Sequence, residues 1–219
     1  MKNKLKLKVL VACEYSATVR DAFAALGHDA WSCDLLPSDK GGKHIQGNVL
    51  DILDQGWDLM IAHPPCTYLT NSGVCWLWQK GKKNVKVQDR WDLLDEGAAF
   101  FRALLECDIP RIAIENPIPH KYAVSRIGRK YDQLVQPYHF GHMESKATCF
   151  WLKGLQPLRH TSNLRAATLA LPYEERNRLH YLPPSKDRWK IRSQTYQGIA
   201  DAIADQWGAE VSQQYALPF

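Results

Sequence analysis

The sequence lacks the long apolar runs and the paired cysteines that would identify several protein classes. No stretch of about 18 consecutive apolar residues occurs, so we expect no membrane-spanning segment. The six cysteines form no C-x-x-C pair, and we therefore expect no zinc knuckle and no metal site. They are embedded in strand-like segments of a 219-residue chain, which predicts reduced thiols and a cytoplasmic protein.

Two glycine-rich phosphate-binding patterns are also missing. The segment ACEYSATVRDAF, residues 12–23, follows the first predicted strand, where a phosphate- or nucleoside-binding turn is expected. It contains neither G-x-G-x-x-G nor the Gly-Lys-Ser/Thr of a P-loop, so it offers a pyrophosphate no glycine cradle. A nucleoside ligand without phosphates fits this turn better.

Positive charge is concentrated in the second half of the chain. Residues 121–192 carry 14 Lys and Arg against five Asp and Glu, whereas residues 1–120 carry 14 against 15. This asymmetry favours a polyanionic partner such as a nucleic acid. A solvated basic face is the alternative interpretation.

Strand-like and helix-like segments alternate along the chain. We expect seven strands, within residues 5–13, 28–34, 44–52, 57–63, 111–116, 134–141 and 147–154, and helices over 18–26, 90–107 and 195–208. The alternation predicts an α/β fold with a doubly wound, mostly parallel sheet, in a single domain over residues 1–219. The last two strands are joined by a link too short for a crossover helix, so this pair should be antiparallel.

Several of these strands end in polar or reactive residues. The carboxyl ends of parallel strands share one edge of a sheet, and ligands bind there, near the point where the strand order reverses. The residues expected at this edge are Cys13, Glu14, Tyr15, Ser16, Asp34, His63, Pro64, Pro65, Cys66, Glu115 and Asn116. Asp34 is placed to accept hydrogen bonds from two ribose hydroxyls, and Asp51 from an amine. For each aspartate, a helix cap or turn is the alternative.

The HPPC corner at residues 63–66 ends an apolar run at two prolines, which donate no backbone hydrogen bond. Cys66 follows them at the expected start of a loop or helix, where backbone N–H groups favour a thiolate. Glu115 ends a neighbouring strand and is placed to act as an acid toward a ring nitrogen. The alternatives are a protease-like pair with His63 or His120 as base, and an inert buried cysteine.

These motifs resemble those of a known family. HPPCT and IENP are similar to the Pro-Cys and Glu-Asn-Val motifs of the C5-cytosine DNA methyltransferases. VLVACEYSATVRDAFAALGHDAWSCDL resembles the first two strand ends of S-adenosylmethionine-dependent class I methyltransferases. FGHMESKATCFWLKGL and RSQTYQGIADAIADQWG resemble segments of short phage-type members. The resemblance implies a Rossmann-like fold and a location in the cytoplasm of a bacterium or a phage-infected cell.

The resemblance also implies a mechanism, in which a methyl group passes from S-adenosylmethionine to C5 of cytosine in DNA and leaves S-adenosylhomocysteine. Cys66 would add to C6 of a base outside the duplex, Glu115 would hold or protonate N3, and Asn116 would orient the ring and the Cys66 loop. The cofactor residues it implies are Cys13, Glu14, Tyr15, Ser16, Asp34, Leu35, Asp51 and Pro64.

DNA contacts are expected on both sides of Cys66. The residues assigned to substrate or DNA are Pro65, Thr67, Lys82, Lys83, Arg90, Arg188 and Arg192. Residues 78–90, WQKGKKNVKVQDR, carry five basic residues against one acid, which suits a loop that closes over phosphates. Residues 118–192 would contain a small basic recognition region. We expect a monomer or weak dimer.

The chain also departs from the family's pattern. Ala17 stands where many related chains have glycine, Thr67 where the large enzymes have glutamine, and Pro117 where they have valine. No Gln-x-Arg-x-Arg motif is present. The alternatives left open are an amino-methyltransferase, an enzyme that methylates C5 of a free pyrimidine nucleotide, and a non-catalytic DNA-binding module on a methyltransferase fold.

Overall fold

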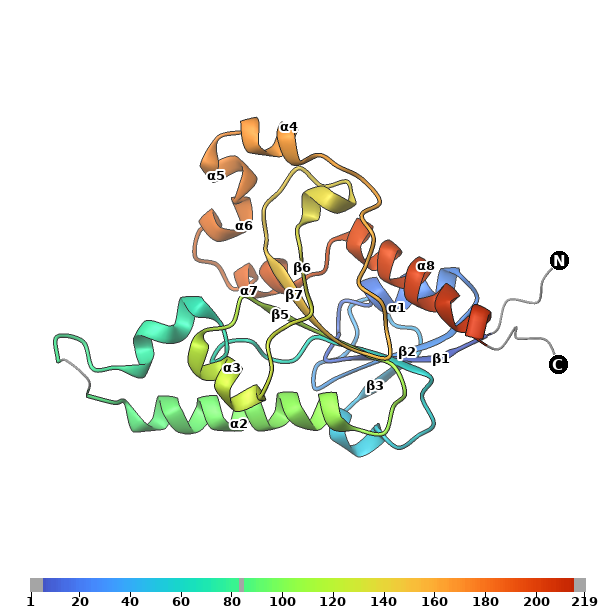
Figure 1. Ribbon diagram of the computed structural model, residues 1–219, viewed down its shortest axis with the longest axis horizontal. Coiled ribbons are helices and arrows are strands. Elements are labelled where there is room, and N and C mark those ends of the chain that lie inside the picture. Colours follow the sequence, from blue (N-terminus) through green and yellow to red (C-terminus); the bar gives the residue numbers. More distant parts are fainter. Residues whose placement is uncertain (1–5, 83–84, 215–219) are drawn as a thin grey trace.

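The fold is built on a seven-stranded sheet (Figure 1), which a computed structural model describes for residues 6–82 and 85–214. The strands are β1 (Lys8–Ala12), β2 (Asp29–Asp34), β3 (His44–Gln46), β4 (Leu59–Ala62), β5 (Ile112–Pro117), β6 (Gln133–Val135) and β7 (Thr148–Lys153). The α-helices are α1 (Thr18–Ala25), α2 (Gln88–Glu106), α3 (Lys121–Ile127), α4 (Arg165–Ala170), α5 (Tyr173–Arg176), α6 (Arg178–Tyr181), α7 (Arg188–Ser193) and α8 (Gln197–Gln214). The 3₁₀ helices are η1 (Val49–Ile52), η2 (Asn71–Leu77) and η3 (Pro137–Phe140).

The strand order is β3-β2-β1-β4-β5-β7-β6, and β7 runs antiparallel to both of its neighbours. All the other pairings are parallel. The predicted doubly wound, mostly parallel sheet with an antiparallel strand near its end is therefore confirmed. The strand expected over residues 134–141 is shorter, because Pro137 has no N–H to donate and begins the 3₁₀ helix η3.

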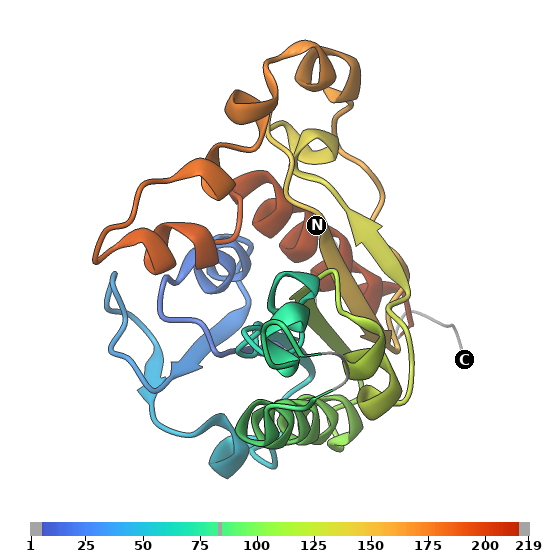
Figure 2. The same ribbon diagram turned by 90° about the vertical axis from the view of Figure 1, so that its left-hand side faces the viewer.

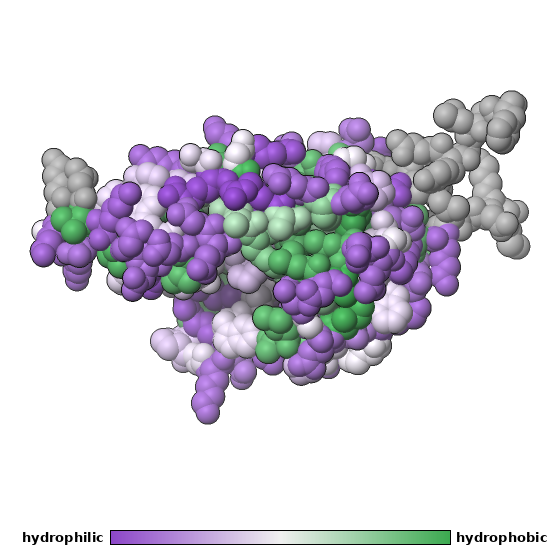
Figure 3. Space-filling model, turned by 90° about the horizontal axis from the view of Figure 1, so that it is seen from below, coloured by the Kyte–Doolittle hydropathy of each residue, from purple (hydrophilic) through white to green (hydrophobic). Residues whose placement is uncertain are grey.

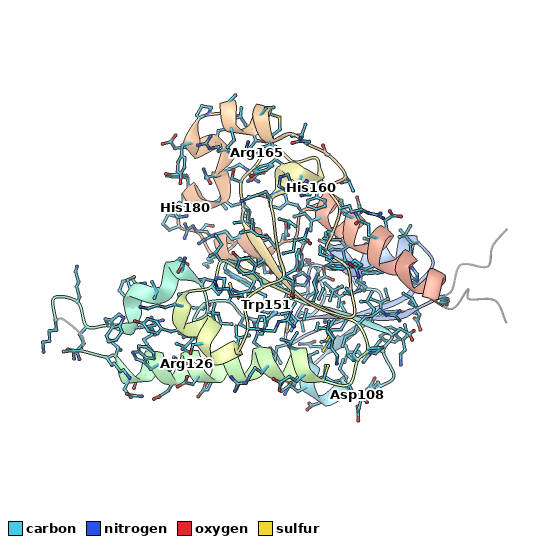
Figure 4. The ribbon with its side chains drawn as sticks, in the orientation of Figure 1. Asp108, Arg126, Trp151, His160, Arg165 and His180 are labelled. Carbon is cyan, nitrogen blue, oxygen red and sulfur yellow. The ribbon has the colours of Figure 1, made fainter. Side chains whose placement is uncertain are left out.

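Alternate side chains of the strands enter two separate cores. Val9 and Val11 of β1 pack with α1 and α8 on one face of the sheet, whereas Leu10 and Ala12 pack with α2 on the other. Figure 1 shows these two layers on opposite sides of the sheet. Trp151 of β7 lies near the middle of the molecule (Figure 4) and is fully buried. The near-continuous apolar strands of the sequence are therefore explained by a sheet covered on both faces.

Helix α2 is amphipathic. Leu94, Phe101 and Leu105 recur at helical spacing and are buried, while Asp92 and Glu96 are exposed. Figure 3 views the molecule from the side of α2, with hydrophilic side chains over most of this face and a smaller apolar area near its middle. Within the described ranges, no helix is both long and apolar enough to cross a lipid bilayer.

The chain after β7 forms a lobe and then returns to the sheet. Helices α4, α5 and α6 project away from the sheet (Figure 1), and α7 brings the chain back to the first loop before α8 packs beside α1. Residues 155–190 form loops and short helices.

A strained backbone position lies in the first loop. Ala17 precedes α1 with φ 62° and ψ 12°, in the left-handed region that glycine adopts without cost. This conformation costs an alanine about 1–2 kcal/mol. At position 17, where many related chains have glycine, glycine would therefore be less strained than alanine.

We expect Ala17→Gly to be less destabilising than Ala22→Gly by about 1–2 kcal/mol. Both alanines are buried, so each variant loses one buried methyl and gains the same backbone freedom when unfolded. Only at position 17 does the substitution also relieve a positive φ. Urea unfolding of the two variants gives the difference, and equal free energies of unfolding would contradict the assigned strain.

Candidate active site

Cys66 begins a turn immediately beyond the end of β4. All four residues of β4 are buried, and His63, Pro64 and Pro65 carry the chain past the edge of the sheet. The amides of Leu69 and Thr70 both donate to the carbonyl of Cys66, at 3.0 and 3.2 Å. The loop start expected at this cysteine is therefore present.

The free thiol of Cys66 is not in the ionisation state expected from the sequence. Burial raises the pKa of Cys66, and the nearby Glu115 carboxylate raises it further. The turn's backbone and the positive charges of Lys146 and Arg192 lower it by less. A loop start was expected to favour the thiolate, but desolvation outweighs that effect. The raised pKa favours the neutral thiol of Cys66 over its thiolate.

Glu115 and Asn116 end β5 beside β7. In the register of the two strands, Glu115 lies opposite Phe150 and Asn116 opposite Cys149. Asn116 is fully buried, and its side-chain amide donates to the carbonyl of Pro117. Its Oδ1 has no hydrogen-bond partner among the residues the structure describes. Asn116 thus shapes the strand end and leaves one acceptor free.

His63 and Glu115 form a close pair across the ends of β4 and β5. His63 Nδ1 lies 3.6 Å from Glu115 Oε2, with 12% of the histidine side chain and 21% of the glutamate side chain exposed. Both residues line a pocket together with Lys146, Thr148, Phe150, Ser193, Thr195, Tyr196 and Ile199. Cys66 is not among these lining residues, although its thiol lies within electrostatic range of Glu115 and Lys146.

Lys146 is a site residue that was missed in the sequence. It precedes β7, and because β7 is antiparallel, Thr148 lies beside Pro117 at the edge where β4 and β5 end. Lys146 Nζ donates to the carbonyls of Arg192 and Gln194, at 2.9 and 3.2 Å. Burial lowers the pKa of Lys146, which the charges of Glu115 and Cys66 partly oppose. The predicted antiparallel pairing of the last two strands could have placed Lys146 at this edge, because Lys146 directly precedes the second of these strands.

The first loop uses most of its polar groups internally. The Glu14 carboxylate accepts the amides of Val19 and Arg20, at 2.7 and 3.2 Å, and so caps α1. Ser16 Oγ donates to the same carboxylate. The Tyr15 hydroxyl lies 2.9 Å from Ser193 Oγ in α7. Glu14 and Ser16 are therefore committed to the loop itself, and Tyr15 joins the loop to α7.

The other residues assigned to the cofactor gather at the ends of β1, β2 and β3. The pKa of the Cys13 thiol is raised to about 12, first by burial and then by Asp34, so these two residues are neighbours. Asp51 lies exposed in η1 and contributes to raising the pKa of Cys33. Leu35 is 73% exposed, and Pro64 is buried.

Asp34 keeps part of its hydrogen-bonding capacity. Its Oδ1 accepts the amide of Leu36 at 2.9 Å, in the turn that was the alternative interpretation. No described residue donates to its Oδ2. A partly exposed carboxylate oxygen at this strand end has the chemistry that ribose hydroxyls need.

The basic residues assigned to DNA lie on two sides of this edge, which faces the viewer in Figure 2. Lys82 is exposed on the loop after η2, and Arg90 lies 5.4 Å from the ring of Tyr68 at the start of α2. Lys83 falls outside the described residues. On the other side, Arg188 donates to the carbonyls of Leu182 and His180 within its own lobe.

Two residues beside Cys66 are exposed, as a substrate contact requires. These are Pro65 and Thr67. A Cβ on Gly73 would lie 2.7 Å from the Thr67 carbonyl, so η2 packs tightly against this turn. Arg192, across the pocket, has an exposed side chain while its carbonyl binds Lys146.

No group of three or more potential metal-ligating side chains occurs within residues 6–82 and 85–214.

No protein-family model and no curated protein matches the chain. One similar solved structure is a protein assigned as a DNA modification methyltransferase encoded within a prophage of E. coli, with 15% identity and a TM-score of 0.45. Another is the Entamoeba histolytica methyltransferase EhMeth, with 14% identity and a TM-score of 0.44. The matches cover 77% and 73% of this chain, but only 56% and 58% of those proteins.

Proposed function

We propose that this protein is a DNA methyltransferase that transfers a methyl group from S-adenosylmethionine to C5 of cytosine. The observation that carries the proposal is the arrangement of Cys66 and Glu115. Cys66 follows β4, and Glu115 lies near the end of the neighbouring parallel strand β5, within electrostatic range of Cys66. Glu115 also lines a pocket at this edge of the sheet. A thiol nucleophile beside a carboxyl group is the pair that addition to a cytosine ring requires.

The residues near the first strands suit the cofactor that the proposal requires. Parallel β1 and β4 are neighbours at the point where the strand order reverses, which is where ligands bind in open α/β sheets. Asp34, with Oδ2 free, is assigned to the ribose, and exposed Leu35 and Asp51 to the adenine side. Bound there, S-adenosylmethionine would supply an electrophilic methyl group.

The chain's own residues would handle addition and release. The Cys66 sulfur adds to C6 and breaks the C5=C6 π bond, whose electrons pass through the ring to N3. Glu115 donates a proton to N3, so the adduct carries no anion. After C5 is methylated, a solvent water takes the C5 proton, which restores the C5=C6 bond and expels Cys66 as a thiolate, and N3 returns its proton to Glu115.

Charge and exposed aromatic rings support DNA as the substrate. The loop after η2 carries exposed Lys80, Lys82 and Lys86, and η2 itself carries Trp76 with 62% of its surface exposed. The lobe formed by α4–α7 carries a further group of exposed aromatic and basic side chains, namely Tyr173, Tyr181, Trp189, Arg178, Lys186 and Arg192. Cations suit phosphates, and exposed rings suit unstacked bases.

A covalent trap tests the proposal. The wild-type protein is incubated with labelled S-adenosylmethionine and a duplex whose cytosines are 5-fluorocytosine, because the C5 fluorine cannot leave as a proton and the adduct is retained. We expect a labelled protein–DNA adduct that survives denaturing electrophoresis. Methylation of ordinary DNA without an adduct would instead indicate an amino-methyltransferase. DNA binding without transfer would indicate a non-catalytic module, and transfer only to a free nucleotide would exclude DNA as the substrate.

A further inference from the structure

His63 occupies a fixed position between the strand end and the pocket. Its backbone amide donates to the carbonyl of Ala12 at 2.9 Å, which ties the end of β4 to the end of β1. Only 12% of its side chain is exposed. The ring is therefore held at the switch point of the sheet, three residues before Cys66.

Each ring nitrogen of His63 faces a different environment. Nδ1 lies 3.6 Å from Glu115 Oε2, and Nε2 is buried without a partner among the residues described. A buried imidazole nitrogen without a partner is uncommon, because burial of a polar atom without a hydrogen bond is unfavourable. A protonated imidazole ring with one nitrogen toward a carboxyl group can pass its proton to that group and take it back later.

The other charged groups around this pair have different roles. Lys146, from the segment before β7, donates to two backbone carbonyls, so its protons are committed to the chain that follows α7. Arg192, at the end of α7, carries a charge that is not lost at ordinary pH. Cys66, in the turn after β4, is the proposed nucleophile. Cys149 of β7 and Tyr196 before α8 hold their protons, because burial raises the pKa of both. Of these described groups near Glu115, His63 is therefore the one suited to exchange a proton with it.

We infer that His63 is a positioning residue that supplies the Glu115 carboxyl group with the proton it donates to N3 of cytosine. The inference rests on the proposed function. As the Cys66 thiolate forms its bond to C6, the Glu115 carboxylate takes the proton of His63 Nδ1 and passes it to N3. The imidazolium becomes a neutral histidine, Glu115 ends as a carboxylate, and the adduct is uncharged at N3. When the adduct collapses and expels Cys66, the N3 proton returns to the His63–Glu115 pair.

The inference requires the protons to be in particular places when the reaction begins. Because burial raises the pKa of the Cys66 thiol, this thiol must lose its proton before it attacks C6. The His63–Glu115 pair must at the same time hold the proton that N3 receives.

We therefore expect His63→Gln to lower the single-turnover methylation rate about 100-fold. Glutamine retains a polar side chain but carries no exchangeable charge. His63→Ala should show the same loss, and imidazole added to the buffer should restore part of the rate. His160→Gln is the control, because His160 is exposed away from the pocket (Figure 4). Its ring stacks on that of His139.

The outcomes separate this inference from the proposed function. If the wild-type protein forms the 5-fluorocytosine adduct but His63→Gln keeps the wild-type rate, or imidazole restores nothing to His63→Ala, the inference is wrong and the proposed function stands. If the wild-type protein forms no adduct and transfers no methyl group, both are wrong. Thermal unfolding of each variant shows that it is folded. If His63→Gln does not fold, the alanine variant and its response to imidazole decide in the same way.

Discussion

Cys66→Ser is expected to lower methyl transfer to cytosine by roughly 10⁴-fold or more, the loss typical when a covalent nucleophile is removed. Serine preserves the size and hydrogen bonding of the side chain, but its hydroxyl ionises far less readily than a thiol and is a much weaker nucleophile. Transfer of labelled methyl groups to a cytosine-containing duplex measures the loss. The 5-fluorocytosine adduct should disappear in the same variant.

The matched control is Cys75→Ser. Cys75 is exposed in η2, nine residues after Cys66, and takes no part in the pocket. This variant should retain wild-type transfer and the wild-type adduct, and both variants should bind DNA as the wild type does in a gel-shift assay. Undiminished transfer by Cys66→Ser would rule out covalent catalysis by this cysteine.

Lys146→Met is expected to lower transfer by roughly 10²- to 10³-fold through two effects. Loss of a positive charge near Cys66 and Glu115 raises the pKa of the thiol further, by an amount typical of one close opposite charge. The variant also loses the two hydrogen bonds that hold the segment after α7 over the pocket. Alkylation of Cys66 by iodoacetamide, followed by mass spectrometry, should require a higher pH than in the wild type.

Lys153→Met provides the comparison for this variant. Lys153 ends the strand that Lys146 precedes, so the two lysines lie at opposite edges of the sheet. Lys153 Nζ donates to the Cys107 carbonyl, far from the pocket in the register of the strands. Its replacement should leave the alkylation profile of Cys66 unchanged. An unchanged profile in Lys146→Met as well would show that this lysine does not influence the thiol.

The fold was predictable because its signals are local. Continuous apolar strands such as 57–63 indicated a sheet covered on both faces, and the short link between the last two strands indicated their antiparallel pairing. The short helices after residue 155 had weak periodicity, so their boundaries could not be predicted. The sequence did signal that β6 ends before Pro137, since proline has no N–H to donate and begins η3.

The site was only partly predictable because it depends on pairing between distant strands. Cys66, Glu115 and Asp34 could be placed at one edge, since strand ends have distinct sequence patterns. The position of Lys146 at this edge follows from the direction of β7. The burial that raises the pKa of Cys66 depends on tertiary packing, which the sequence does not show directly. The hydrogen bonds that commit Glu14 to capping α1 likewise required the folded loop.

The antiparallel course of β7 has a consequence for how the protein can diversify. All seven strands are complete at Lys153, and His63, Cys66, Glu115 and Lys146 all precede that point. The later residues reach the reactive edge mainly through the chain from α7 to the start of α8. Under the proposed function, insertions within the lobe of α4–α6 would therefore change which nucleic acids dock while leaving the proposed reacting groups in place. The residues proposed to react therefore lie before Lys153 in the sequence, and the residues proposed to select the target lie after it.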